Sequence, residues 1–464
     1  MRGGREQAPG QRANGAKAKG RQNGKARPAG RRLGGWDVKE LRERLYAYLE
    51  TKRRLTWPFF AALGRWYLLA AGMGLLCGGV GAAFSHAISA ATALRAAAPW
   101  LVFLLPLAGL AIAGLYHLGN MDNDRGTNLI LEGARAEGQP PLRLAALIFA
   151  GTVLTHLCGG SSGREGAALQ MGGCMGSWLA RRMHLTTENR VMLLLCGMSG
   201  LFSALFGTPV AAAVFSIEVA SVGIFQNAAL FPCILSATAA SQLARLLGVH
   251  PVAYALAEPA AKNGWLVLAT ALLGLGCAAV SILFCSAMHK AHHLYTRCLP
   301  NPFWRAAAGG ALVALLTVLC GAQTYNGAGG EVIHAALAGE AGSWMFLLKI
   351  LFTALTLGAG FKGGEIVPSF FVGATFGCVV GGWLGLGPGF GAALGLIAVF
   401  CGVTNCPLAS ILLSVEMFGS GHLALFALAN AVSYFMSGRY SLYDSQRLAL
   451  PKLSLSFEDT VHLH

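Results

Sequence analysis

Apolar stretches separated by short polar or glycine-rich breaks follow one another along the chain after residue 57. Several are shorter than the about 20 residues that a helix needs to cross a bilayer. Others are interrupted by glycine and proline, most clearly 366–415, which contains no charged residue. The pattern predicts tilted, broken and re-entrant membrane helices that pack against one another. The stretches that suit helices lie near 58–94, 98–118, 144–158, 191–217, 223–247, 264–289, 306–323, 343–360, 366–401, 404–417 and 421–437.

The composition agrees with a membrane protein. Hydrophobic residues make up 55% of the 464 residues and charged residues only 12%, whereas soluble domains carry about 25% charged residues. The 12 cysteines lie almost all inside apolar stretches, with no CxxC pair and no Cys/His cluster. We therefore expect buried packing cysteines, no disulfide framework, no metal site and no cofactor.

The charge distribution divides the chain into three regions. Residues 1–55 are basic, and we expect a disordered cytoplasmic tail with a short amphipathic helix. Attraction of this tail to anionic lipids stays open, whereas nothing in its pattern favours nucleic-acid binding. Residues 56–448 are expected to form the membrane domain, with halves at about 56–250 and 251–448. We expect 449–464 to be a short C-terminal tail without a regulatory soluble domain.

The membrane domain contains an internal repeat. Residues 208–219 align with 406–417, and proline, alanine, serine and glutamate recur at matching places with an offset of 198 (416 − 218). At an offset of 200 (365 − 165), the Gly-Arg-Glu-Gly break at 163–166 corresponds to the Gly-Gly-Glu-Ile break at 363–366. Duplicated halves with interrupted apolar segments are typical of transporters whose site lies where the repeats meet.

The break at Gly163-Arg164-Glu165-Gly166 is the main candidate for function. It is charged, yet residues 144–162 before it contain no Asp, Glu, Lys or Arg, and the next charged residue is Arg181. Charges at membrane depth cost at least a few kcal/mol each and are functional by default. Irregular backbone at that depth is tolerated only where it lines a cavity, so a polar solute is expected beside Glu165.

Helix starts inside the membrane can bind an anion without a full positive charge. The first turn carries unpaired N–H groups and about half a positive charge. Several converging starts therefore bind an anion that can still leave. Three glycine-rich starts supply candidate anion-binding residues: Gly126, Thr127 and Asn128; Gly163, Arg164 and Gly166; and Glu365, Ile366 and Val367, the last three before Pro368.

Glu165 is the candidate gate and proton carrier. A carboxylate beside an anion site can occupy that site as a tethered competing anion. A carboxyl group in a low-dielectric site near anions is protonated more readily than in water, and the neutral form can swing away. The alternative is a structural role, as an ion pair with Arg164 or as a helix cap.

Gly163-Arg164-Glu165-Gly166-Ala167, followed by Gln170, resembles the signature of the CLC family of chloride channels and proton-coupled anion exchangers. Phe206-Gly207-Thr208-Pro209, Asn405-Cys406-Pro407 and 363–368 come in the family's order, and Tyr443 matches its central anion-coordinating tyrosine. The resemblance covers about 58–448. It implies an all-α integral membrane fold of about 18 helices in two inverted repeats. It also implies a homodimer with one anion pathway per subunit.

Two departures concern the anion contact and the proton path. The family's Gly-Ser-Gly-Ile-Pro segment is replaced by 124–128, where Gly126 takes the serine position. Backbone amides, with the Thr127 hydroxyl, must then supply that contact. Val219 stands where proton-exchanging chloride members carry a second glutamate, which puts the intracellular proton path of those members in doubt.

A third departure, Glu365, concerns the choice of anion. Ordinary members carry an apolar residue there, and a glutamate together with Val219 resembles the family's bacterial fluoride-exporting branch. However, Gly126 and Val367 replace that branch's methionine and threonine. Chloride and fluoride both stay open.

The sequence therefore predicts a multi-pass anion transporter of the bacterial inner membrane with cytoplasmic termini. It is expected to move chloride or fluoride against protons through Glu165, with a passive chloride channel as the alternative. Small inorganic anions, protons, membrane lipids and a second copy of the chain are the expected partners, and no nucleic acid is expected. A sodium- or solute-coupled transporter with a discontinuous-helix site is a further alternative.

An enzyme is not expected. Residues 159–163 satisfy G-x-S-x-G, which would make Ser161 a nucleophile. That motif marks a nucleophile only on a strand–turn–helix elbow with His and Asp partners. Here it lies in a membrane break.

Other polar residues are expected to be structural. Glu218 and Glu416 recur by the repeat and suit helix ends. His156 is expected to be a buried, hydrogen-bonded histidine rather than a proton relay. Asp122, Asp124 and Arg125 are expected in a solvent-facing loop.

Overall fold

The computed structural model describes residues 38–122, 124–260, 264–448 and 452. The chain divides into two units, residues 1–61 and 62–464. The described residues of the first unit belong to helix α1, Val38–Ala97, whose C-terminal part belongs to the second unit. The expected domain boundary at residue 55 falls inside this helix. The expectations for residues 1–37, and for 449–464 apart from Lys452, lie outside the described residues.

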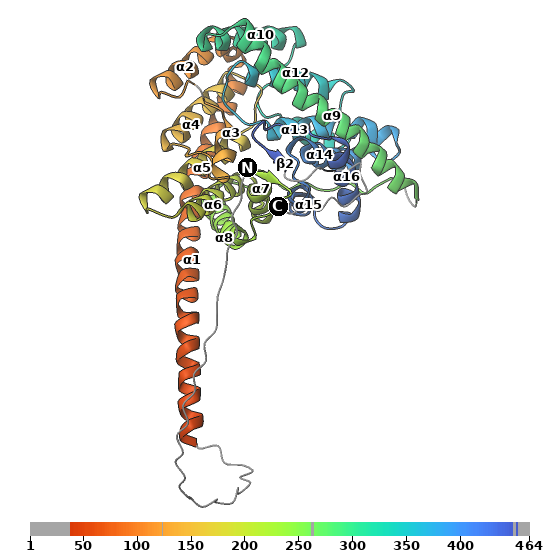
Figure 1. Ribbon diagram of the computed structural model, residues 1–464. Coiled ribbons are helices and arrows are strands. Elements are labelled where there is room, and N and C mark those ends of the chain that lie inside the picture. The colour runs from red at the N-terminus through yellow and green to blue at the C-terminus, as the bar shows by residue number, and fades with distance from the viewer. Residues whose placement is uncertain (1–37, 123, 261–263, 449–451, 453–464) are drawn as a thin grey trace, which may run out of the picture. The chain divides into compact units, whose positions relative to one another are not determined.

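Helices make up most of the described second unit (Figure 1). After α1, the N-terminal half contains η1 (a 3₁₀-helix, Pro99–Leu104), α2 (Leu105–Leu118), α3 (Thr127–Ala134), α4 (Leu142–Leu157), α5 (Glu165–Arg182), α6 (Thr187–Phe206), α7 (Pro209–Glu218), β1 (Ser221–Val222) and α8 (Asn227–Leu246). The C-terminal half contains α9 (Gly264–Cys298), α10 (Pro302–Cys320), α11 (Gly330–Leu337), α12 (Met345–Gly358), α13 (Ile366–Trp383), α14 (Pro388–Thr404), α15 (Pro407–Phe418), α16 (Leu423–Met436) and β2 (Arg447–Leu448). The two short strands pair in parallel and join the halves.

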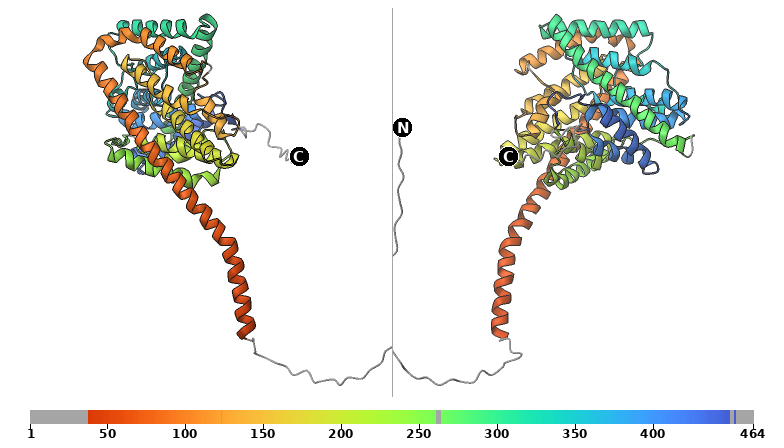
Figure 2. Two further views of the ribbon diagram at one scale, coloured as in Figure 1. Left: turned by 90° about the vertical axis from the view of Figure 1, so that its left-hand side faces the viewer. Right: turned by 45° about the vertical axis from the view of Figure 1, so that its right-hand side comes forward.

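The helices differ widely in length, as predicted. Within the described residues, seven helical segments are long and apolar enough to cross a membrane, and six more apolar helices have only 10–17 residues. The 35-residue α9 (green in Figures 1 and 2) runs obliquely past its neighbours and packs on α12, α14 and α16. This mixture of long, oblique and short helices is the expected broken architecture.

Equivalent breaks interrupt the two halves. Helix α6 ends at Gly207, which has φ +73°, and Pro209 opens α7 two residues later. Helix α14 ends at Asn405, which has φ +58°, and Pro407 opens α15. A left-handed residue ends a helix, and proline suits the first turn of the next because no intrahelical N–H is needed there. The predicted stretch 191–217 is therefore two helices.

Glu218 and Glu416 each cap the start of a helix in the opposite half of the chain. The Glu416 carboxylate accepts hydrogen bonds from the backbone N–H groups of Val210 (3.0 Å) and Ala211 (2.8 Å) at the start of α7. The Glu218 carboxylate accepts from Leu408 (3.2 Å) and Ala409 (2.9 Å) at the start of α15. The expected helix-end role is confirmed, and each glutamate caps a helix of the opposite repeat.

Glycines allow the central helix pairs of both halves to touch. A Cβ atom on Gly197 of α6 would clash with the carbonyl oxygen of Gly172 on α5. A Cβ atom on Gly395 of α14 would clash in the same way with the carbonyl oxygen of Gly373 on α13. Small residues allow membrane helices to approach this closely. The pairs α5–α6 and α13–α14 are therefore equivalent cores of the two repeats.

The predicted all-α, duplicated membrane architecture is confirmed. The described residues form 16 α-helices and one 3₁₀-helix, close to the expected number. Two details differ from the sequence-based expectation. The single stretch 366–401 is divided by a turn at Gly385 (φ +72°) into α13 and α14, and the short helix α11 was not predicted.

Candidate functional site

The two charged breaks of the repeat meet in the structure. Gly163 N–H donates to the Gly364 carbonyl (2.6 Å), and Gly364 N–H donates to the Gly163 carbonyl (2.7 Å), which forms an isolated antiparallel bridge. A Cβ atom on Gly166 would lie 2.8 Å from the Gly364 Cα atom. Glycine is therefore required for the two chains to lie this close. The bridge places the start of α5 beside the start of α13.

Glu165 is the first residue of α5, and its side chain is 5% exposed. Its Oε2 atom accepts a hydrogen bond from the backbone N–H of Arg164 (2.9 Å), and its Oε1 atom lies 3.3 Å from Arg164 Nε. Arg164 also donates to the Ser85 hydroxyl (2.9 Å). The carboxylate thus folds back over the N-terminal end of its own helix, where an anion would be favoured.

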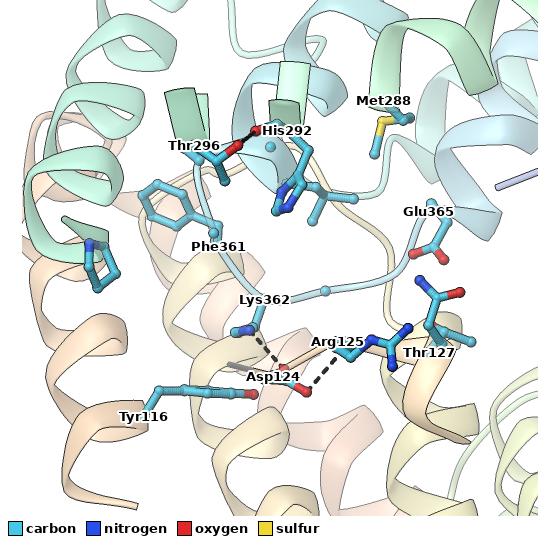
Figure 3. A pocket seen from close by; sticks show the side chains of 18 of the residues that line it. Tyr116, Asp124, Arg125, Thr127, Met288, His292, Thr296, Phe361, Lys362 and Glu365 are labelled. Atoms are coloured by element: carbon cyan, nitrogen blue, oxygen red, sulfur yellow. Dashed lines mark hydrogen bonds and ion pairs between the residues drawn. The ribbon is translucent and has the colours of Figure 1, made fainter. Parts of the chain in front are cut away.

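Glu365 holds the equivalent place at the second break. It is the N-cap residue of α13, directly before the buried Ile366 and Val367. A Cβ atom on Gly166 would lie 3.2 Å from Glu365 Oε2, so this carboxylate reaches the start of α5. In Figure 3 the Glu365 side chain points into a cavity.

That cavity has a volume of about 670 Å³. Five of the predicted site residues line it: Gly126, Thr127, Asn128, Glu365 and Tyr443. The others, Gly163, Arg164, Glu165, Gly166, Ile366 and Val367, are not among its lining residues. A Cβ atom on Gly163 would lie 3.1 Å from Val367 Cβ, so this second group gathers around the Gly163–Gly364 bridge.

The start of α3 is held by side chains from other elements. Gly126 is the N-cap with φ +58°, a conformation that suits glycine. Gln170 of α5 donates to the Thr127 hydroxyl (3.1 Å), and Ser445 N–H donates to the Asn128 side-chain oxygen (3.0 Å). All three predicted helix starts are therefore in one region.

Tyr443 also lies in this region and is 2% exposed. Its backbone N–H donates to the Ser441 hydroxyl (3.1 Å). Its own hydroxyl is buried and has no hydrogen-bond partner within the described part of the chain.

The sequence did not reveal an ion pair at the cavity wall. Lys362 Nζ lies 2.9 Å from Asp124 Oδ2, and the Asp124 side chain is only 1% exposed. The expectation of a solvent-facing Asp124 is therefore wrong, whereas Asp122 and Arg125 are exposed as expected. The two partners are far apart in the sequence, and no local pattern signals their contact.

A buried cation, Lys349, was also not predicted from the sequence. Lys349 is fully buried, and its ammonium group donates to the carbonyls of Tyr325 (3.1 Å) and Gly327 (2.7 Å). Its nitrogen lies 5.1 Å from the centre of the Phe371 ring. Backbone carbonyls and an aromatic face satisfy this charge. In the sequence, the only sign of this buried charge is a lysine inside the apolar stretch 343–360.

Two other expectations can be compared with the structure. His156 is 1% exposed, and its Nδ1 atom lies 2.9 Å from the Thr152 carbonyl, as expected for a buried, hydrogen-bonded histidine. Ser161 is fully buried, and its hydroxyl lies 3.0 Å from the Thr353 hydroxyl. Ser161 therefore contacts α12, and no histidine is bonded to its hydroxyl within the described part of the chain.

The fold and the meeting of the two breaks define a duplicated membrane transporter. Comparison with known proteins gives its family. The family model described as voltage gated chloride channel matches residues 110–438. A chloride/fluoride channel protein of Pseudomonas syringae pv. tomato is 36% identical over 397 residues, which cover 84% of this chain and 88% of that protein.

Two solved structures are also similar. A CLC-type fluoride/proton antiporter matches with a TM-score of 0.80 at 33% identity, over 83% of this chain and 98% of that chain. A slow cyanobacterial Cl⁻/H⁺ antiporter matches with a TM-score of 0.68 at 20% identity, over 80% of this chain and 94% of that chain, which supports the fold alone. The chain belongs to the CLC family, as the motifs indicated. It is a multi-pass membrane anion transporter and not an enzyme.

Proposed function

We propose that the chain is a fluoride/proton antiporter in which Glu165 is the protonatable gate. The observation that carries this proposal is the Gly163–Gly364 bridge. It joins the start of α5, which bears Glu165, to the start of α13, which bears Glu365. Two carboxylates from the two repeats thus share one junction.

In this mechanism the backbone N–H groups at the starts of α3, α5 and α13 bind the anion. The charged Glu165 side chain competes with the anion for the start of α5. Protonation removes this competition, since a neutral carboxyl group is no longer attracted to the helix N-terminus. The side chain can then leave with its proton while an anion enters, which couples the two movements in opposite directions.

The choice of fluoride rests on Glu365 and on the relatives. Two of the similar proteins are described as a chloride/fluoride channel protein and a fluoride/proton antiporter. Fluoride is a compact and strong hydrogen-bond acceptor, so a protonated carboxyl group can bind it better than it binds chloride. The Glu365 carboxyl group lines the cavity from which an anion would approach.

The same proposal extends to location and assembly. The relative from Pseudomonas is bacterial, which supports the bacterial inner membrane. The basic N-terminal region favours a cytoplasmic N-terminus, and we place the C-terminus on the same side. A homodimer in contact with membrane lipids is the expected assembly, with one anion pathway in each subunit.

The Glu165→Gln variant tests the gate. In liposomes that contain the purified protein, we expect proton movement to fall to the level of protein-free liposomes while anion flux continues at a changed rate. The glutamine side chain is similar in size but carries no exchangeable proton at this step. Fluoride-selective and pH electrodes record both fluxes from one sample.

Glu416→Gln is the matched control, because it changes a glutamate that caps α7 and lies outside the cavity. Its proton-to-anion ratio should equal that of the wild type. Undiminished proton coupling in Glu165→Gln would remove Glu165 from the mechanism.

A further inference from the structure

An ion pair links the two helix starts that face the cavity. Asp124 lies two residues before Gly126, the N-cap of α3, and Lys362 lies three residues before Glu365, the N-cap of α13. Lys362 Nζ lies 2.9 Å from Asp124 Oδ2, and Asp124 Oδ1 accepts a hydrogen bond from the Gly126 N–H (3.0 Å). The pair therefore joins the two repeats at the anion site (Figure 3).

Lys362 is held in place by a cation–π contact and by packing of its aliphatic stem, as well as by its ion pair. Its nitrogen lies 4.0 Å from the centre of the Tyr116 ring. A Cβ atom on Gly151 of α4 would lie 3.0 Å from both the Cβ and the Cγ atoms of Lys362, so the stem of the side chain lies directly on that helix. The cation–π contact and the close packing of the aliphatic part of the side chain hold the ammonium group in one position.

Both members of the pair line the cavity. An uncompensated aspartate there would repel an entering anion, since the Asp124 side chain is only 1% exposed and its charge would be weakly screened. An uncompensated lysine would hold the anion and slow its release. Two other lining residues also have partners, since Arg125 pairs with Glu132 (2.8 Å) and Asp444 lies 3.2 Å from His289, whereas Arg305 and Glu365 line the cavity without an ion pair among the described residues.

We propose that Asp124 and Lys362 set the anion affinity of the cavity by neutralising each other, so that the pair adds no net charge beside the pathway. Both act on the anion through the local electric field and not by direct contact. This inference rests on the proposed anion pathway through the cavity. It does not depend on proton coupling.

The test is equilibrium binding of fluoride and of chloride to the purified full-length protein, measured by calorimetry. Asp124→Asn leaves a net positive charge, so the anion Kd should fall. Lys362→Met leaves a net negative charge, so the Kd should rise. We expect shifts of about tenfold in each direction, the effect of one charge acting over about 10 Å at an effective dielectric constant of about 20.

The double variant Asp124→Asn/Lys362→Met removes both charges and should return the Kd to near the wild-type value. It also keeps the test valid where Lys362→Met does not fold, because the double variant buries no unpaired charge. Tighter binding by Asp124→Asn than by the double variant then isolates the charge of Lys362.

A purely structural clamp would shift both single variants in the same direction or would lower only their thermal stability. Either result would overturn the inference, and so would a wild-type protein that binds neither anion. Loss of proton coupling in transport, with the opposite Kd shifts retained, would contradict the proposed antiport and leave the inference standing.

Discussion

At the scale of single residues, two carboxylates meet at one junction but have different surroundings. Glu165 is buried and contacts the backbone and side chain of Arg164. Glu365 lines the cavity. In the proposed mechanism, Glu165 competes with an anion at the start of α5, whereas Glu365 meets the anion earlier on its path.

Glu365 should determine the preference for fluoride. We expect Glu365→Gln to lower the ratio of fluoride to chloride flux by about tenfold, since one hydrogen bond to a charged group contributes about 1.5–3 kcal/mol. Flux measurements with both anions in parallel liposomes give this ratio. Glu340→Gln is a control at an exposed glutamate of the same half. An unaltered ratio in Glu365→Gln would make Glu365 a structural helix cap.

The residues of the junction could be predicted because charged residues are rare in the apolar background and because glycine marks the predicted helix starts. Glu165 and Gly126 stood out for these reasons. Lys362 and Asp124 did not, because each follows the expected pattern of a polar loop and only the fold brings them together. The burial of Asp124 could therefore not be predicted from the local sequence.

At the scale of helices, glycine contacts between α5 and α6, and between α13 and α14, set the spacing of each half. In both pairs, a Cβ atom added to one glycine would clash with the carbonyl oxygen of the other. The repeat offset of 198 residues also relates Gly197 to Gly395 (395 − 197). The structure gives the physical reason for that match.

Substitution at either contact should separate the helices. We expect Gly197→Ala and Gly395→Ala each to lower the midpoint of thermal unfolding in detergent by about 1–3 °C or more, because overpacking against backbone costs about 1–3 kcal/mol or more and a chain of this length loses about 1 °C per kcal/mol. Gly72→Ala is the matched control, since a Cβ atom there meets no atom within 4 Å. Unchanged midpoints at 197 and 395 would show that the helices adjust without cost.

Helix boundaries were harder to predict than helix positions. The break at Gly207 and Pro209 carries both a left-handed residue and a proline, yet an apolar stretch spanning it was expected as one segment. Hydropathy averages over such short turns. The reciprocal caps by Glu218 and Glu416 could be predicted only as helix ends, since the identity of the capped helix depends on the fold.

At the scale of the whole molecule, duplication explains how the site is built. Each repeat supplies one charged or polar break, and neither half alone can close the Gly163–Gly364 bridge. Transporters of this kind commonly bind their substrate where the repeats meet. The fold, the family and the meeting of the breaks followed from the motifs and the repeat offset, whereas the anion could not be chosen from the motifs alone.

The most direct test of antiport uses purified wild-type protein in liposomes with a fluoride gradient and equal pH on both sides. We expect fluoride running down its gradient to drive protons in the opposite direction, against the pH gradient that builds up. A chloride gradient of the same size should drive much less. Fluoride flux with no proton movement above that of protein-free liposomes would contradict proton coupling and make the protein a passive anion channel.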